Sequence, residues 1–279
     1  MRNKNTPIQT LLILLCVTGM LACPTYADHR TAQNGITITA DGWVYPGKTV
    51  LRNGEVYVSL REFATTMDNA VVTWQPQDRS AAVRTDSLTL TAWHGKTYLI
   101  ANERYLWCPG GTYVENGVML VPLSAAARAF GFTTNGTTDG HIELYRIRGA
   151  IEPGEQFYDT DAVYWLAKII HAEAQGEPLS GKVAVGEVVM NRVESDEFPD
   201  TIYGVIFDTT HGVQFTPTVN GAIQAEPGEE STVAAKLALD GARTGEGLLY
   251  FLNPKTAVST WIPTSRPYAM TIGNHAFYR

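Results

Sequence analysis

The stretch DTDAVYWLAKIIHAEAQGEP, residues 159–178, predicts one amphipathic helix with a capped start and a sharp end. Asp159 has the short acceptor side chain that caps a helix N-terminus, and Gly176 and Pro178 end the helical pattern. Continuing the apolar face by three or four residues reaches Glu173. The apolar positions that define this face are Ala162, Leu166, Ile169 and Ile170.

Glu173 is the carboxylate that this helix would place at the end of a buried face. Burial would desolvate its carboxyl group and raise the pKa, as a general acid working near neutral pH requires. The alternative is that Glu173 lies on the rim of the face in water, as glutamates on amphipathic helices commonly do. The helix pattern leaves both interpretations open.

Helical patterns continue beyond this stretch. We expect a second helix over about 181–193, capped by Ser180, a third short helix starting at Pro199, and a fourth over about 231–242. Two short strands are predicted at 248–251 and 269–272, the second continuing through a Gly273-Asn274 turn to 275–278. Residues 159–279 therefore predict a mainly helical domain with a small sheet.

Residues 35–148 show a different pattern, of short alternating runs broken by Gly, Asn and Pro, which is typical of strands. A weak repeat at an offset of 63 carries Asn53-Gly54 and Leu60 into Asn116-Gly117 and Leu123. Each copy predicts a strand that runs into a short helix, over 60–67 and 123–130. Residues 149–158 lack apolar periodicity and predict a linker. The predicted fold class is α+β.

The first 27 residues predict a secretory signal peptide. Arg2 and Lys4 precede an apolar run over 11–22, which is too short to span a bilayer of ~30 Å. Cleavage after Ala27 would suit the small residues at Thr25 and Ala27. A competing lipoprotein-type signal would place a lipid anchor on Cys23. In both cases we expect a secreted, extracytoplasmic protein with no transmembrane segment in the mature chain.

Composition excludes several functions. The 28 acidic and 21 basic residues give a formal net charge of −7, so nucleic acid is not an expected partner. No metal or cofactor is expected. His171-Ala172-Glu173-Ala174-Gln175 lacks the second histidine of a zinc peptidase helix, and the chain has no Gly-x-Ser-x-Gly motif.

Ordered motifs in the C-terminal half resemble the cell wall hydrolases of the SleB/CwlJ type, the spore cortex-lytic enzymes. They are HAEAQGEP at 171–178, NRV at 191–193, FPxT at 198–201, QFTP at 214–217, YFxNP at 250–254 and IGxHxF at 272–277. The resemblance spans about residues 160–277. It implies a lysozyme-like fold that cuts the glycan strands of peptidoglycan in the cell wall or spore cortex, with Glu173 as the catalytic acid.

The same resemblance implies a substrate groove. We expect its aromatic and amide side chains to contact sugar rings, and Tyr250 and Phe251 alternate on a strand, so only one of them should face the groove. His171 lies on another face of the helix than Glu173, and His275 is expected to hydrogen-bond at a strand end. The implied substrate-binding residues are Glu177, Gln214, Phe215, Asn220, Tyr250, Asn253 and Trp261.

Two reaction outcomes stay open. A lytic transglycosylase uses one carboxyl group, since the C6 hydroxyl of the substrate attacks the anomeric carbon and leaves a 1,6-anhydro end. A hydrolytic muramidase needs a second carboxylate at ~5–5.5 Å or ~6.5–9.5 Å from the first. Glu177 and Glu187 are the candidates. We expect Glu187 to pair with Arg192 or Lys182 on the helix surface, the alternative being that it points into the groove.

The pattern Asn-Gly-x-x-x-Val-x-Leu followed by a short helix resembles the N-terminal domain of certain copper amine oxidases, over about residues 36–145. No copper is implied, because His94 and His141 lack ligand-like spacing. This half is expected to be a binding or spacer domain. The alternative to an enzyme is a non-catalytic protein in which both halves bind wall polymers and the lysozyme-like domain is degenerate.

Overall fold

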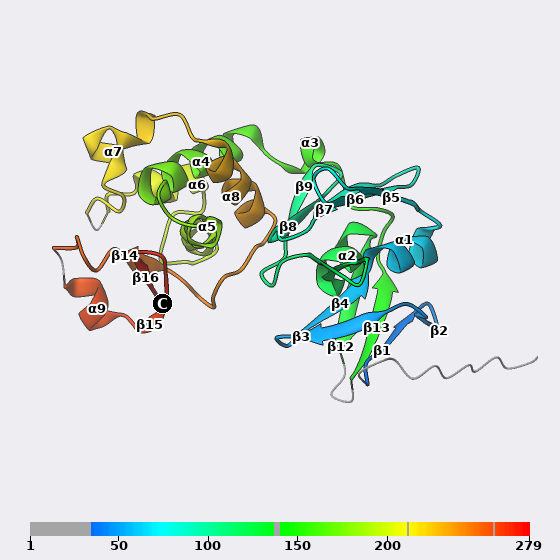
Figure 1. Ribbon diagram of the computed structural model, residues 1–279. Helices are drawn as coiled ribbons and strands as arrows, with labels where there is room; N and C mark the ends of the chain where they lie inside the picture. The colour runs from blue at the N-terminus through cyan, green and yellow to red at the C-terminus, as the bar shows by residue number, and fades with distance from the viewer. Residues whose placement is uncertain (1–34, 137–139, 211, 259) are drawn as a thin grey trace, which may run out of the picture. The chain divides into compact units, whose positions relative to one another are not determined.

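The structure is a computed structural model that describes residues 35–136, 140–210, 212–258 and 260–279 (Figure 1). All of these residues fall within one structural unit. The predicted signal peptide and Cys23 lie outside the described residues. No helix in the described part of the chain is long and apolar enough to cross a membrane.

Two Asn-Gly turns organise the N-terminal half, as the sequence repeat predicts. One joins β3 (Thr49–Arg52) to β4 (Glu55–Ser59), and the other joins β10 (Tyr113–Glu115) to β11 (Val118–Pro122). At both turns the asparagine and the glycine have positive φ, which suits these two residue types in a tight hairpin. Strands β4 and β11 pair antiparallel, so the two hairpins form one sheet of order β10-β11-β4-β3.

A short helix follows each hairpin, α1 (Leu60–Asp68) and α2 (Leu123–Ala129), which confirms the predicted strand-to-helix units. Phe63 of α1 packs on Tyr45 and Phe130, with ring centroids 5.9 and 5.6 Å apart. Cys108 is fully buried nearby in the same core.

Two further sheets complete this half. The first is an antiparallel meander of β5 (Val71–Gln75), β6 (Ser80–Arg84), β7 (Thr89–Trp93), β8 (Tyr98–Ala101) and β9 (Arg104–Trp107). The second has the order β12-β13-β1-β2 and pairs β1 with β13 in parallel. Its strands are β1 (Thr37–Ala40), β2 (Trp43–Val44), β12 (Phe132–Gly136) and β13 (His141–Arg146). The half is therefore β-rich, as predicted.

Three helices build the core of the C-terminal half: α4 (Thr160–Ala174), α5 (Leu179–Val193) and α8 (Glu229–Leu239). Asp159 caps α4 by accepting a hydrogen bond of 2.8 Å from the Ala162 amide, as predicted. The predicted cap Ser180 lies inside α5 instead. Pro178 has extended backbone geometry and no N–H to leave unpaired, so the helix begins directly after it.

The remaining elements are short. They are α3 (Gly154–Phe157), α6 (Ile202–Phe207), α7 (Pro217–Asn220), a 3-10 turn (Ala222–Gln224) and α9 (Trp261–Ser265), together with the strands β14 (Tyr250–Leu252), β15 (Tyr268–Ile272) and β16 (His275–Tyr278). The predicted third helix starts at Ile202, not Pro199, because Thr201 caps it by accepting from the Gly204 amide. The sheet has the order β14-β16-β15, so β14 is an edge strand.

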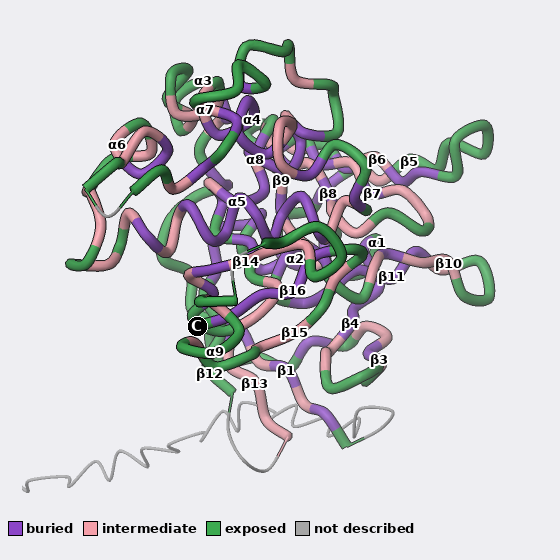
Figure 2. The backbone as a smooth tube through the Cα atoms, turned by 90° about the vertical axis from the view of Figure 1, so that its left-hand side faces the viewer, coloured by how far each residue is buried: buried purple, intermediate pink, exposed green. Residues whose placement is uncertain are grey.

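Helix α5 is buried along most of its length, as Figure 2 shows. Gly186 lies where α5 meets the other two helices. A Cβ atom at this position would lie 2.9 Å from Cβ of Ala238 and 3.0 Å from Cδ1 of Ile170. The missing side chain therefore lets α4 and α8 approach α5 closely, which fixes the helix that carries Glu173.

Asp240, directly after α8, joins the two halves of the chain. Its carboxylate accepts hydrogen bonds from Arg104 of β9 and Arg128 of α2, and from the hydroxyl group of Tyr158. The Asp240 and Arg104 side chains are 1% and 4% exposed. Tyr98, Tyr105 and Trp107 of the meander also pack against the C-terminal core. The β-rich half thus contacts the helical half through β8, β9 and α2.

Replacing Asp240 by asparagine should lower the free energy of unfolding by about 3 kcal/mol, because the buried Arg104 guanidinium loses its counter-charge. Urea unfolding monitored by tryptophan fluorescence measures the change. Asp86→Asn, at an exposed position, is the matched control. A loss under about 1 kcal/mol in D240N would show that the ion pair does not stabilise this interface.

Candidate active site

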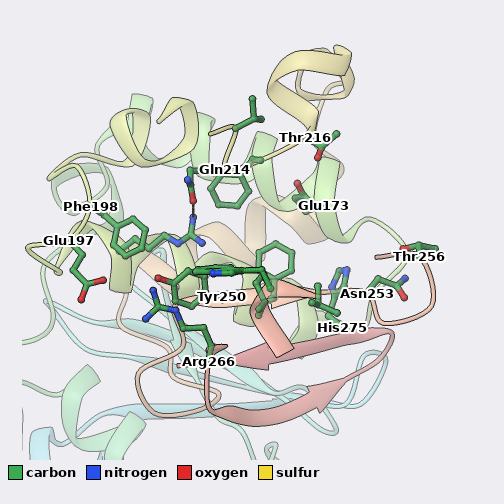
Figure 3. A pocket seen from close by; sticks show the side chains of 17 residues that line it. Glu173, Glu197, Phe198, Gln214, Thr216, Tyr250, Asn253, Thr256, Arg266 and His275 are labelled. Carbon is green, nitrogen blue, oxygen red and sulfur yellow. Dashed lines mark hydrogen bonds between the residues drawn. The ribbon is translucent and has the colours of Figure 1, made fainter. Parts of the chain in front are cut away.

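A cavity of ≈ 1060 Å³ lies in the C-terminal half, between the end of α4 and the small sheet (Figure 3). Its wall includes side chains from α4, α5, α9, β14 and β16, and from the segment over residues 213–216. It brings together six of the predicted site residues, which are Glu173, Gln214, Phe215, Tyr250, Asn253 and Trp261.

Glu173 lies in the last turn of α4 with its carboxyl group in this cavity (Figure 3). Burial raises the pKa of this carboxyl to about 7. Among the residues that the structure describes, none donates a hydrogen bond to the Glu173 carboxyl group or forms an ion pair with it. Within that part of the chain, the desolvation of the charged form is therefore not offset. Of the two interpretations that the helix pattern leaves open, the geometry agrees with the desolvated carboxyl.

Arg192 ties the cavity wall together. Its Nε donates to the Leu249 carbonyl at 2.8 Å, and one terminal nitrogen donates to Oε1 of Gln214 at 3.3 Å, the dashed line of Figure 3. The guanidinium carbon lies 4.8–5.4 Å from the ring centroids of Phe198, Phe215 and Tyr250. Burial lowers the pKa of Arg192 to about 10, so it stays charged at neutral pH.

Tyr250 and Phe251 both line the cavity, and the prediction that only one of them faces the groove is wrong. The two residues alternate on β14, but β14 is an edge strand of its sheet, and all three of its residues line the cavity. Side chains from both faces therefore reach it. Tyr250 packs against Trp261 with centroids 5.7 Å apart, and Phe251 packs against His275 at 5.3 Å.

His275 lies on the sheet side of the cavity, where Figure 3 draws it next to Asn253. It is 6% exposed, and its Nδ1 has no hydrogen-bond partner among the described residues, so the predicted strand-end hydrogen bond is not found there. Burial lowers the pKa of this imidazole, although the nearby Glu177 opposes the shift. The ring is therefore neutral at pH 7.

The structure does not bring Glu177 and Asn220 into the cavity wall. Glu177 accepts hydrogen bonds from the backbone and side-chain amides of Asn274, at 2.9 and 3.0 Å, and so holds the β15–β16 turn. Burial opposes ionisation, but these two bonds lower the pKa of Glu177 overall. Asn220 accepts from the Ala222 amide at 2.9 Å, between α7 and the 3-10 turn.

The expected surface ion pair of Glu187 is wrong, and so is its alternative in the groove. Glu187 is fully buried in α5 and accepts two hydrogen bonds from Thr244, at 2.6 and 2.7 Å. Lys182 pairs with Glu230 instead, and Arg192 turns to the cavity. The reason is that α5 is the central helix and offers no solvent face at this point.

Several residues of the cavity wall were not predicted from the sequence as site residues, among them Arg192, Glu197, Phe198, Arg266 and His275. Phe198 and His275 stand in motifs that the sequence shows, but their direction depends on tertiary packing. His171 contacts Ser231 and the Gly228 amide at 3.3 Å and does not line the cavity.

Two families match the chain. Residues 176–278 match the Cell Wall Hydrolase family, and residues 38–140 match the copper amine oxidase N-terminal domain. The chain is 40% identical over 122 residues to a spore cortex-lytic enzyme of Oceanobacillus iheyensis, covering 44% of this chain and 43% of the relative. It is 38% identical over 120 residues to that of Bacillus subtilis, covering 43% and 38%. The chain thus spans less than half the length of these curated relatives.

Two solved structures are also similar. The catalytic domain of the germination-specific lytic transglycosylase SleB from Bacillus anthracis is 37% identical, with 46% of this chain and all of that chain covered and a TM-score of 0.41. The catalytic domain of the Bacillus cereus SleB protein is 38% identical, with 44% and 92% covered and a TM-score of 0.40.

The raised pKa of Glu173 predicts a pH-dependent stability difference from Glu173→Gln. Below about pH 4.5 the carboxyl is protonated in the folded and the unfolded chain, so burial adds no ionisation penalty. Between about pH 4.5 and 7 the Glu173 carboxyl ionises in the unfolded chain but stays mostly protonated in the folded one. The free energy of unfolding of the wild type should therefore fall by about 2 to 3 kcal/mol relative to that of the variant. Urea unfolding at pH 4, 5.5 and 8 measures this; a constant difference across that range would contradict a buried, uncompensated carboxyl.

Proposed function

We propose that this chain, whose C-terminal half belongs to the Cell Wall Hydrolase family, is a lytic transglycosylase that cleaves the glycan strands of peptidoglycan with Glu173. The observation that carries the proposal is a carboxyl group with a pKa of about 7 in a cavity lined by aromatic and amide side chains. Such a group is protonated in a large fraction of molecules near neutral pH, as a general acid must be.

In the first half of the reaction Glu173 donates its proton to the glycosidic oxygen between muramyl and glucosaminyl residues. The bond from the muramyl C1 to that oxygen breaks, and positive charge develops at C1. In the second half the C6 hydroxyl of the same muramyl residue attacks C1, and the Glu173 carboxylate takes the hydroxyl proton. The products are a free hydroxyl end and a 1,6-anhydro-muramyl end. No water is consumed, and Glu173 regains its proton.

The arrangement of the other carboxylates supports this route over two-carboxylate hydrolysis. Glu177 is held by Asn274 and Glu187 by Thr244, and neither of them lines the cavity. Glu197 does line it, but Figure 3 draws this residue toward the far end from Glu173. A transglycosylase needs no second carboxylate, which is consistent with a cavity in which Glu173 stands apart from the other acids.

The cavity wall suits a sugar polymer. Tyr250 and Trp261 offer apolar ring faces on which pyranose rings stack, while Gln214 and Asn253 offer amide groups to hydroxyl and acetamido groups. The relatives are named for spore cortex, and we assign cortex peptidoglycan as the substrate of this chain. The β-rich half would bind the wall or act as a spacer.

The proposed substrate implies an address outside the cytoplasm. We extend the proposal to secretion by the signal over residues 1–27, with acylation of Cys23 as the alternative fate of that signal. Mass spectrometry of the mature N-terminus distinguishes the two: Asp28 as first residue supports ordinary cleavage, and a diacylglyceryl Cys23 supports a lipid anchor.

Digestion of purified sacculi and spore cortex tests the function. The wild-type protein should release muropeptides with anhydro-muramyl ends, and Glu173→Gln should reduce the release at least about 100-fold, because no group remains to protonate the leaving oxygen. Activity of the wild type should fall as pH rises through about 7, where the acid ionises. Mass spectrometry identifies the ends.

Glu246→Gln, at an exposed position in the same half, is the matched control and should cleave like the wild type. Reducing ends that carry an added water would reject the transglycosylase route and leave a hydrolase. Release of no fragments from either substrate would reject the enzyme and favour a wall-binding protein.

A further inference from the structure

Arg266 is a cation in the cavity wall that the proposed cleavage chemistry does not use. It follows α9, and its guanidinium carbon lies 4.5 Å from the ring centroid of Tyr250 and 5.2 Å from that of Trp261. Its side chain donates no hydrogen bond and forms no ion pair within the described part of the chain. Its Nε is buried and has no acceptor there. The guanidinium is therefore held in place by ring stacking, with its donors unused.

A guanidinium group that is held by stacking and has unused hydrogen-bond donors is suited to bind an anion. The terminal nitrogens of Arg266 also have no acceptor in the described part of the chain, and a ligand that supplies one would form a charge-assisted hydrogen bond. The planar fork of arginine matches a carboxylate in bidentate geometry, and stacking on two rings reduces the freedom that binding would otherwise remove. The second cation of the wall, Arg192, already donates to Leu249 and Gln214. Of these two arginines, Arg266 is therefore the one whose hydrogen-bond donors are all unused within the described part of the chain.

We propose that Arg266 binds a carboxylate of the muramyl substrate and so makes this cavity selective for muramyl strands over neutral amino-sugar polymers; the proposal rests on the proposed function. Each muramyl residue that is not a lactam carries a lactyl group that ends in a carboxylate or is extended by a peptide with carboxylates of its own. Strands of N-acetylglucosamine alone, and muramyl lactam rings, have no such anion to offer.

The position of the carboxylate relative to the cleaved bond follows from the cavity. Figure 3 draws Arg266 and Glu197 toward one end, and Glu173 with Thr256 toward the other. The bound carboxylate would thus belong to a stem some distance from the reacting C1, and it would anchor the strand without touching the reacting atoms. Glu197, exposed at the same end, is the acidic side chain of the wall that would repel this carboxylate.

Binding to the full chain with the additional change Glu173→Gln tests the proposal without any cleavage. Four probes are titrated by calorimetry: a disaccharide tetrapeptide muropeptide, the same muropeptide with its carboxylates converted to methylamides, the disaccharide with a free lactyl carboxylate, and chitotetraose. Arg266→Gln should weaken binding of the carboxylate-bearing probes by roughly tenfold or more, the size expected of a charge-assisted hydrogen-bonded pair. It should leave the methylamide probe and chitotetraose unchanged.

Matched variants separate charge from packing. Arg84→Gln removes one exposed positive charge in the β-rich half and should change nothing, whereas Glu197→Gln should tighten binding of the same carboxylate probes. Arg266→Lys keeps the charge without the fork and should recover only part of the affinity. A loss confined to the tetrapeptide muropeptide assigns a peptide carboxylate, and a loss shared with the free lactyl disaccharide assigns the lactyl group.

Equal weakening of all four probes by Arg266→Gln would overturn the proposal, because it would make Arg266 a mere support for Tyr250 and Trp261. Unchanged binding of every probe would overturn it as well. Both results are independent of catalysis: a wild-type protein that binds muropeptides through Arg266 but cleaves no glycan would overturn the proposed function alone.

Discussion

The proposed acid chemistry of the cavity depends on one carboxyl group being partly withdrawn from water. The pKa of the Glu173 carboxyl is raised to about 7 because the residue lies at the end of a buried helix face. No neighbour in the described part of the chain compensates its negative charge. That position is set by the packing of α4 against α5 and α8, where Gly186 allows the helices to approach.

The other buried carboxylates of this half show what Glu173 lacks. Glu177 is stabilised as an anion by the two amide donors of Asn274, and Glu187 receives both donors of Thr244. Asp240 is surrounded by two guanidinium groups and a hydroxyl group. These three acids accept hydrogen bonds that fix a turn, a helix and an interface, although burial still raises the pKa of Glu187. Their hydrogen bonds make them structural, whereas the isolation of Glu173 suits it to exchange a proton.

The cavity wall combines aromatic rings with arginine side chains, so under the proposed function stacking and charge recognition would come from different groups. Aromatic faces can stack on sugar rings whether or not the sugar is charged. The guanidinium group of Arg192, at the end of α5, packs on the aromatic rings of Phe215 and Tyr250. The β-rich half contributes from a distance: through Arg104 and Asp240 it holds the end of α8, the helix against which α4 packs. The two halves are mechanically connected at the same helix that supports the site.

Features that depend on near neighbours along the chain could be predicted from the sequence. These include the Asp159 cap, the two Asn-Gly hairpins with their helices, and Glu173 at the end of an apolar face. Local spacing is sufficient for each, because caps, turns and helix faces are formed by residues within a few positions of one another.

The tertiary structure decided what depends on distant partners. Glu177 meets Asn274 across 97 positions and Glu187 meets Thr244 across 57, and these partners decide where the two carboxylates lie. Tyr250 and Phe251 both reach the cavity because β14 lies at a sheet edge, which alternation along one strand does not reveal. Arg266 becomes a candidate anion-binding residue only because the fold places its guanidinium against the rings of Tyr250 and Trp261. The burial of a side chain and its hydrogen-bond partners are set by contacts between residues far apart in the sequence, and local sequence patterns do not encode such contacts.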